Sequence, residues 1–351
     1  MSYKTELVKH ALEINKADAF LIASDTNRFW ISEFSSSAGY VIATKKIIYL
    51  FLDKRYYQKA IDTINDIDIK IVCFTSKNQI LDCLKENNVN TLMVEKEYFS
   101  FDDYLFVKNS IKNIINFPSD ILRIQKTEYE IFNIQRAVDI TCETLNWIQN
   151  QNLIGLTEIE VANMVACHML ELGASKNSFD TIVASGKNGA YPHHRPTKKV
   201  IEDNEFVTVD MGCIYNGYCS DVTRTFPIGF PHKLLIDAYK AVYHSNSLGI
   251  EKATYKSIGK DVDKICRDTI ASYGFKDYFV HGTGHGVGIN VHELPNVAPS
   301  YEGKLENNSI VTIEPGIYIP DLGGIRIEDM VLVKKDGSVW MTEKGKRWIF
   351  N

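Results

Sequence analysis

The sequence predicts two domains of different class, an α/β domain over residues 1–120 and an α+β domain over residues 121–351. The length of 351 residues fits about two domains of ~150 residues each. Helix and strand signals alternate before residue 120, whereas after it they occur in separate blocks. The turn cluster Phe117-Pro-Ser-Asp120 separates the two patterns and predicts the domain boundary.

The first domain begins with an amphipathic helix over residues 4–15. Its strands are short apolar runs bounded by polar residues, and a helical segment over residues 80–87 precedes the last of them. The predicted strands cover residues 19–23, 40–43, 47–52 and 91–94. This alternation is typical of an α/β domain.

The second domain opens on two capping boxes, each of which predicts the start of a helix. Thr127 with Glu130 begins a helix that should extend to about Gln151. Thr157 with Glu160 begins a second helix, which should end at Gly173. Short strands follow from residue 181, a helical stretch over residues 231–274 interrupts them, and strands then resume. Separate blocks of helices and antiparallel strands predict an α+β domain.

Composition excludes several classes of function. The net charge is −5 and no basic stripe is present, so we expect no nucleic-acid partner. Charges interrupt the N-terminal residues and the longest apolar runs have the length of strands, so we expect neither a signal peptide nor a membrane span. Seven cysteines without a CxxC pair predict reduced thiols in a cytoplasmic protein.

Four acidic residues stand at the ends of predicted strands. Residues 205–210 end on Asp210 and residues 217–221 end on Asp221, with the hairpin signal Asn216-Gly217 between them. We therefore expect both side chains on one face of adjacent strands. The same arrangement recurs in residues 309–314, which end on Glu314, and in residues 324–328, which end on Glu328.

Burying four carboxylates together is unfavourable unless positive charge neutralises them. Two simpler explanations exist: each acid pairs with a cation such as Arg224 or Arg326, or each lies exposed at an edge. Two divalent metals satisfy all four acids at once. An oxygen-rich ligand set favours Mn(II), Co(II), Fe(II) or Mg(II) over a His-rich zinc site. Two metals that share carboxylates would hold a hydroxide, which is hydrolase chemistry.

The glycine run HGTGHGVG at residues 281–288 has two interpretations, a phosphate loop or a loop that presents histidines. Its glycines are spaced every second residue and Leu294-Pro295 follows in place of a helix, so the dinucleotide pattern does not fit. Gly284 and Gly286 would instead let the backbone pack closely around His285 and leave its ring free to reach a metal. Four of the nine histidines fall on helical patterns, and no role is assigned to His10, His168, His232 or His244.

With these motifs in place, the sequence resembles the metallopeptidases of the "pita-bread" fold, which include methionine aminopeptidase, Xaa-Pro aminopeptidase, Xaa-Pro dipeptidase (prolidase) and creatinase. The matching segments lie in the family's order over about residues 185–333: SGKNGAYPHH, VDMGCIYNGYCSDVTRTF, HGTGHGVGINVHELP, TIEPGIYIP and GGIRIEDMVLV. The N-terminal half is similar to the creatinase-type domain, which the short methionine aminopeptidases lack. The resemblance implies a creatinase-like domain over residues 1–120 and a pita-bread catalytic domain over residues 121–351.

The resemblance also implies the roles of site residues. Asp221 and Glu328 would bridge two metals, Asp210 would complete one site, and His285 with Glu314 would complete the other. Manganese is the metal expected first, with Co²⁺, Zn²⁺ and Fe²⁺ as alternatives. The remaining matches contact substrate or stabilise the tetrahedral intermediate in similar enzymes, and they are His193, His281 and His292. His194 has no counterpart in the family pattern.

The implied reaction is attack of the bridging hydroxide on the carbonyl of an X–Pro bond. His292 would help to hold the oxyanion, and Glu314 would carry the proton to the leaving nitrogen. His193, His292 and Glu314 are therefore the expected catalytic residues. The implied substrates are peptides with proline at the second position, and the resemblance further implies a homodimer.

Two related activities remain open. Prolidases of this type often carry an arginine after the HExP segment, which pairs with the substrate carboxylate, and here that position is Asn296. This favours Xaa-Pro aminopeptidase, with prolidase as the alternative because Arg195 can substitute for the missing arginine. A catalytically inactive binding protein of the same fold is the remote alternative. Such proteins typically lose metal ligands, and all five are present.

Overall fold

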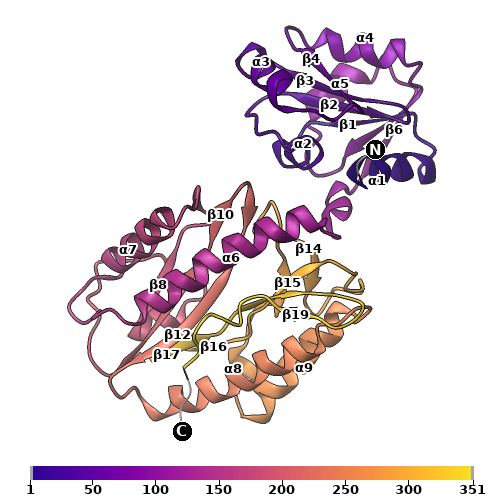
Figure 1. Cartoon of the computed structure of the whole chain (residues 1–351). Helices are drawn as coiled ribbons and strands as arrows, with labels where there is room; N and C mark the ends of the chain where they lie inside the picture. Colours follow the sequence, from indigo (N-terminus) through magenta and orange to yellow (C-terminus); the bar gives the residue numbers. More distant parts are fainter. Residues whose placement is uncertain (1–2, 349–351) are drawn as a thin grey trace. The chain divides into compact units, whose positions relative to one another are not determined.

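The structure, a computed structural model, describes residues 3–348 and consists of two compact units (Figure 1). The first ends at Arg123 and the second begins at Ile124. The boundary predicted at residue 120 falls within η1 (Ser119–Arg123), the last element of the first unit. No helix among the described residues combines the length and apolar character that crossing a membrane requires.

The first unit is an α/β domain built on one six-stranded sheet, as predicted. Its strand order is β4-β3-β2-β1-β5-β6. The strands are β1 (Ala19–Ile22), β2 (Tyr40–Thr44), β3 (Ile48–Leu52), β4 (Ile69–Cys73), β5 (Thr91–Glu95) and β6 (Asn113–Phe117). The predictions did not include the edge strands β4 and β6. Most of their residues are only half-buried or exposed, so neither strand has the continuous apolar run of the central strands.

Five α-helices complete the first unit within the described residues. They are α1 (Tyr3–Ile14), α2 (Asp25–Ser32), α3 (Lys54–Thr63), α4 (Asn78–Glu86) and α5 (Phe101–Val107). The buried residues of α4 and α5 pack on the sheet face that carries Leu21 and Ile42. The two predicted helices correspond to α1 and α4, which confirms both predictions.

Four long helices support the second unit: α6 (Glu128–Ile148), α7 (Glu158–Glu171), α8 (Lys233–Lys252) and α9 (Gly259–Ser272). Both predicted capping boxes are present, at Thr127 with Glu130 and at Thr157 with Glu160. The single helical stretch predicted over residues 231–274 is wrong in one respect, because it is two helices. The connection between them contains Lys256 with a φ of 70°, which a continuous helix does not allow.

Strands of the second unit form two β-ribbons with the same plan. In the first ribbon, β9 (Glu205–Met211) pairs with β12 (Val222–Ile228), and β10 (Cys213–Tyr215) pairs with β11 (Tyr218–Cys219). In the second, β15 (Ile310–Ile313) pairs with β18 (Asp329–Leu332), and β16 (Gly316–Ile319) pairs with β17 (Gly323–Arg326). Each ribbon therefore consists of two strand pairs separated by a short break. We call the pair next to the hairpin turn the inner pair and the other the outer pair.

The breaks correct two predictions. The strand predicted over residues 217–221 covers only β11, and Asp221 lies between β11 and β12, so the residue opposite Asp210 is Thr223. The strand predicted over residues 324–328 ends at Arg326 and pairs with β16, so Glu328 lies in the break before β18. The outer and inner pairs of the first ribbon belong to different sheets, and the chain bends where it changes sheet.

The remaining elements connect these ribbons. They are β7 (Lys176–Asn177), β8 (Ile182–Ser185), η2 (Gly186–Ala190), η3 (Lys276–Tyr278), β13 (Gly284–Gly286), β14 (Glu293–Val297) and β19 (Val339–Trp340). β8 joins β9 and β12 in one sheet, while β13 lies between β14 and β15 in another.

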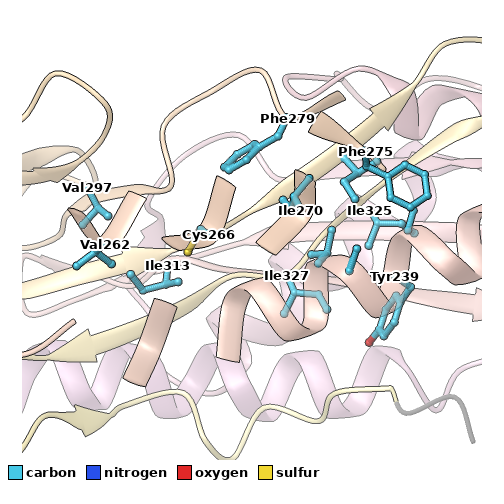
Figure 2. Packing of buried hydrophobic residues seen from close by; sticks show 14 of the residues in the cluster. Tyr239, Val262, Cys266, Ile270, Phe275, Phe279, Val297, Ile313, Ile325 and Ile327 are labelled. Carbon is cyan, nitrogen blue, oxygen red and sulfur yellow. The ribbon is translucent and has the colours of Figure 1, made fainter. Parts of the chain in front are cut away.

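A hydrophobic core fixes the residues that precede the two glutamates. Side chains from α8 and α9 pack against the second ribbon (Figure 2). Ile313 and Ile327 are fully buried in this core, immediately before Glu314 and Glu328. Gly249 of α8 lies against Ile313 so closely that a Cβ atom there would collide with its side chain. Because side chains alternate along an extended chain, each buried isoleucine directs the next residue away from the core.

Candidate metal centre

All eight residues that the sequence singled out line one cavity of about 440 Å³ in the second unit. Three of the acids lie in the breaks of the two ribbons and Asp210 lies near the end of β9, while the histidines come from the segments around β13 and before β9. The eight are Asp210, Asp221, Glu314, Glu328, His193, His281, His285 and His292. The cavity therefore collects residues separated by more than half of the second unit's sequence.

The acids and His285 form two overlapping groups. Asp210, Asp221 and Glu328 offer oxygen atoms that all lie within 4.8 Å of one another. His285, Glu314 and Glu328 form a second group by the same criterion, so Glu328 belongs to both. His285 Nε2 lies 3.3 Å from Glu314 Oε1 and 3.6 Å from Asp221 Oδ2. This arrangement offers two adjacent positions for a cation.

The orientation of His285 follows from the glycines beside it. β13 lies between two strands, and a Cβ atom on Gly284 would collide with the carbonyl of Thr312, while one on Gly286 would collide with the carbonyl of Leu294. His285 Nδ1 lies 3.1 Å from the carbonyl oxygen of Gly286, which leaves Nε2 directed at the acids. The glycines allow close strand packing around His285, as the sequence predicted.

The burial of negative charge is least favourable at Asp221 and Glu328. Burial and the neighbouring charges of Glu328 and Asp210 raise the pKa of Asp221 well above its ordinary value. Burial, with Glu314 and Asp210 nearby, likewise raises the pKa of Glu328. Burial opposes the charged ring of His285, but Glu314 and Glu328 outweigh it and raise the pKa of His285 to about 9. The protein alone does not supply enough positive charge for these carboxylates.

The two arginines considered as neutralising partners have different roles. Arg326 Nη2 donates to Asp210 Oδ2 at 2.8 Å, so one of the four acids has an arginine partner. Arg224 pairs instead with Asp329 Oδ1 at 2.7 Å and also donates to the backbone carbonyl of Glu328. Among the described residues, arginine pairing therefore accounts for Asp210 but leaves Asp221 and Glu328 without an arginine partner.

The donor set fits a pair of divalent cations. Three acids of the set are buried, and Asp210 Oδ1 has no hydrogen-bond partner among the described residues although it is buried. Buried polar atoms are rarely left unsatisfied in folded proteins, and carboxylates whose pKa is raised by mutual repulsion are suited to bind cations. Four carboxylates and one imidazole form an oxygen-rich set.

The other predicted histidines differ in their surroundings. His281 Nε2 lies 2.8 Å from the Tyr318 hydroxyl, and that hydroxyl accepts a hydrogen bond from Arg326 Nη1 at 2.9 Å. The ring of His292 is 4.3 Å from that of His285, centroid to centroid, and His292 is exposed to the cavity. His292 can also offer a ligand atom beside Asp221 and His285, which the sequence reasoning did not consider. His193 is exposed at the rim.

Sequence reasoning missed several residues that line the cavity. Tyr318 faces Arg326 because the β16–β17 ladder places them diagonally, a register that the turn around Asp321 could have indicated. Arg195 and Asp180 also line the cavity, and no hydrogen bond or ion pair joins either to the described residues. Asn296, by contrast, lies in β14 and is not among the residues that line this cavity.

Comparisons with known proteins agree with this geometry. Residues 133–335 match the model of metallopeptidase family M24, and residues 5–124 match the creatinase/prolidase N-terminal domain. The chain is 46% identical to a putative Xaa-Pro aminopeptidase of Mycoplasma genitalium, covering 98% of this chain and 97% of that protein. It is 35% identical to an Xaa-Pro dipeptidase of Pyrococcus horikoshii, covering 99% of both.

Among solved structures, an Xaa-Pro dipeptidase from Bacillus anthracis superposes with a TM-score of 0.94 at 33% identity. The alignment covers 99% of this chain and 98% of that one. The comparison therefore extends over both units of the chain.

Proposed function

Since the chain belongs to metallopeptidase family M24, we propose that it is a dinuclear-metal Xaa-Pro aminopeptidase that removes the residue preceding a proline. Its membership of the family and its relatives establish it as a peptidase, and the relatives are named for Xaa-Pro substrates. The observation that carries the proposal is the pair of overlapping ligand groups in one cavity, which share Glu328.

We assign the ligands as the two groups suggest. Glu328, which belongs to both groups, would contact both metals, Asp210 one of them, and His285 with Glu314 the other. Asp221 belongs to the first group, and its proposed contact with the second metal comes from the family resemblance. When bound, two such cations supply Lewis-acid polarisation of a carbonyl and activation of water at neutral pH. Manganese is the metal proposed first, because the donor set is rich in oxygen.

The chain's own residues would orient the peptide and move its protons. The Glu314 side chain is partly open to the cavity, at 18% exposure, and can carry a proton to the leaving prolyl nitrogen. His292 is exposed beside His285 and can donate to the developing oxyanion. His193 and His281, which also line the cavity, would contact the substrate.

The preference for an aminopeptidase over a dipeptidase rests on the substrate's C-terminal end. A dipeptidase needs a cation for the carboxylate of the bound dipeptide, and Asn296 supplies none. One observation favours the alternative, prolidase: Arg195 lines the cavity, and no described residue pairs with it. These two features give opposite predictions for dipeptides, so a kinetic experiment separates them.

The test compares hydrolysis of Xaa-Pro with that of Xaa-Pro-Yaa, with Mn(II) or Co(II) supplied. We expect the tripeptide to be the better substrate and EDTA to abolish the activity. Turnover of the dipeptide alone would contradict the aminopeptidase assignment, and full activity after chelation would contradict the dinuclear one. In Arg195→Ala, an aminopeptidase should keep its tripeptide activity. A prolidase that uses Arg195 should lose roughly tenfold or more on the dipeptide.

A further inference from the structure

The segment from Ser185 to Thr197 carries His193 and Arg195 to the rim of the cavity, and one buried carboxylate binds it at several points. That carboxylate is Glu158, the first residue of α7, whose side chain has no exposed surface. The metal-centre assignments give Glu158 no role. Its six hydrogen-bond contacts all go to this segment, which we call the rim segment.

The contacts of Glu158 reach the beginning, the middle and the end of the rim segment. Oε1 accepts hydrogen bonds from Ser185 N at 2.9 Å, Ser185 Oγ at 3.0 Å and Asn188 Nδ2 at 3.0 Å. Oε2 accepts from His194 Nε2 at 2.8 Å, Thr197 N at 3.0 Å and Thr197 Oγ1 at 2.7 Å. One side chain therefore ties together residues up to twelve positions apart.

Glu158 is well suited to remain charged in this position. The capping box of Thr157 and Glu160 fixes the start of α7, and the helix N-terminus favours a negative charge. Burial opposes ionisation of Glu158, but hydrogen bonds from His194, Asn188, Ser185 and Thr197 outweigh it and lower its pKa to about 2. An ionised carboxylate only accepts hydrogen bonds, so His194 donates through its Nε2–H.

His194 is the member of this cluster nearest to the chemistry, because it lies between His193 and Arg195 in the chain. Its side chain is 10% exposed and its ring stacks near Tyr191, with centroids 6.4 Å apart. The adjacent carbonyl of Pro192 accepts a hydrogen bond from Arg326 Nη1 at 3.2 Å. The backbone of His193 is thus fixed on both sides, by Arg326 before it and by Glu158 through His194 after it.

We propose that Glu158 and His194 are positioning residues, which hold His193 in the orientation that the reaction requires. The inference rests on the proposed function, in which His193 contacts the substrate. It assigns His194 a role through another residue, because its own ring donates to Glu158. A reacting group displaced by a small distance loses much of its effect, so loss of the pair should reduce catalysis without removing a metal ligand.

The experiment combines kinetics with hydrogen exchange on the full-length enzyme. His194→Ala should lower kcat/KM for an Xaa-Pro-Yaa peptide about tenfold, with unchanged metal content. His194→Gln restores a side-chain donor and should recover most of the activity. His168→Ala is the matched control, because His168 lies on α7 beside Trp147 and does not line the cavity. It should behave as wild type.

A double-mutant cycle separates positioning from general structural support. In a His193→Ala background, His194→Ala should have little further effect on kcat/KM. If its full tenfold effect persists there, the proposal is overturned. The cycle presupposes a wild-type enzyme that cleaves Xaa-Pro-Yaa, so an inactive wild type contradicts the proposed function itself.

Hydrogen exchange tests the inference without reference to activity. In His194→Ala, amides of residues 186–197 should exchange faster than in wild type, while those of β9 should not change. His194→Gln should restore the wild-type pattern. Unchanged exchange of the rim segment in His194→Ala would overturn the proposal even in a fully active enzyme.

Discussion

The two ribbons of the second unit have the same plan, yet they treat their acidic residues differently. Each places two acids in or next to its breaks, and each sends one arginine to the other ribbon. Arg224 of the first ribbon pairs with Asp329 of the second, and Arg326 of the second pairs with Asp210 of the first. The exchange ties the two ribbons together.

The two arginine–carboxylate pairs differ in how completely the carboxylate is satisfied. Asp329 has no exposed surface and accepts hydrogen bonds from four side chains, those of Arg224, Arg347, Trp340 and Thr342. Burial opposes its charge, but Arg224 and Arg347 outweigh it and lower the pKa of Asp329 to about 2.

Asp210 has Arg326, yet its Oδ1 has no hydrogen-bond partner among the described residues. Its pKa is raised by burial. The same kind of ion pair therefore satisfies the Asp329 carboxylate completely but leaves one oxygen of Asp210 without a partner among the described residues. The number of side chains that donate hydrogen bonds to each carboxylate makes this difference.

The largest expected effect comes from the acid shared by both ligand groups. Glu328→Ala should remove both metals and lower kcat/KM at least about 1,000-fold, because metal stabilisation of the transition state is worth several kcal/mol. Asp210 belongs to only one of the two ligand groups, so the Asp210→Ala variant should retain about one metal per chain. Elemental analysis and peptide hydrolysis measure both variants. Two metals retained in Glu328→Ala would refute the shared-ligand assignment.

The free energy of unfolding should distinguish the Arg224–Asp329 pair from the Arg326–Asp210 pair. Asp329→Asn should lower the free energy of unfolding of the metal-free protein by about 3–5 kcal/mol, because it leaves two buried arginines without their charge partner. Asp210→Asn should cost far less, since burial already disfavours the Asp210 charge. Urea denaturation of both variants measures this difference. Equal losses would mean that the two pairs are energetically alike.

The smallest effect tests the arginines themselves. Arg326 donates to Asp210, Tyr318 and the carbonyl of Pro192, and a lysine cannot reproduce this planar set of bonds. Arg326→Lys should lower kcat/KM roughly ten- to a hundredfold. The matched Arg224→Lys variant should instead shift the urea midpoint more than Arg326→Lys does. A larger loss of kcat/KM in Arg224→Lys, with a larger shift of the urea midpoint in Arg326→Lys, would contradict the difference proposed between the two ion pairs.

Local signals in the sequence predicted much of the fold. The capping boxes at Thr127 and Thr157 start helices as expected, because a cap depends on residues only three positions apart. Asn216 and Gly217 form the expected hairpin turn, and both have positive φ. The four acids stand out in the sequence because an acid at the end of an apolar strand needs a charge partner or solvent.

What the sequence could not predict depends on distant contacts. Asp221 and Glu328 lie in breaks because the ribbons change partners there, and no residue beside them signals this change. No local pattern links His194 to its partner, Glu158, which lies 36 residues earlier in the chain. The pairing of Arg224 with Asp329 spans 105 residues and has no local pattern.

The arginine exchange also has a consequence for synthesis on the ribosome. A nascent chain that extends only as far as α8 already contains Asp210 and Asp221, but it lacks Arg326, Glu328 and the Asp329 carboxylate that receives Arg224. The first ribbon then carries an arginine and two acids whose partners have not yet been made. The residues of the cavity therefore cannot all come together until the second ribbon has been synthesised.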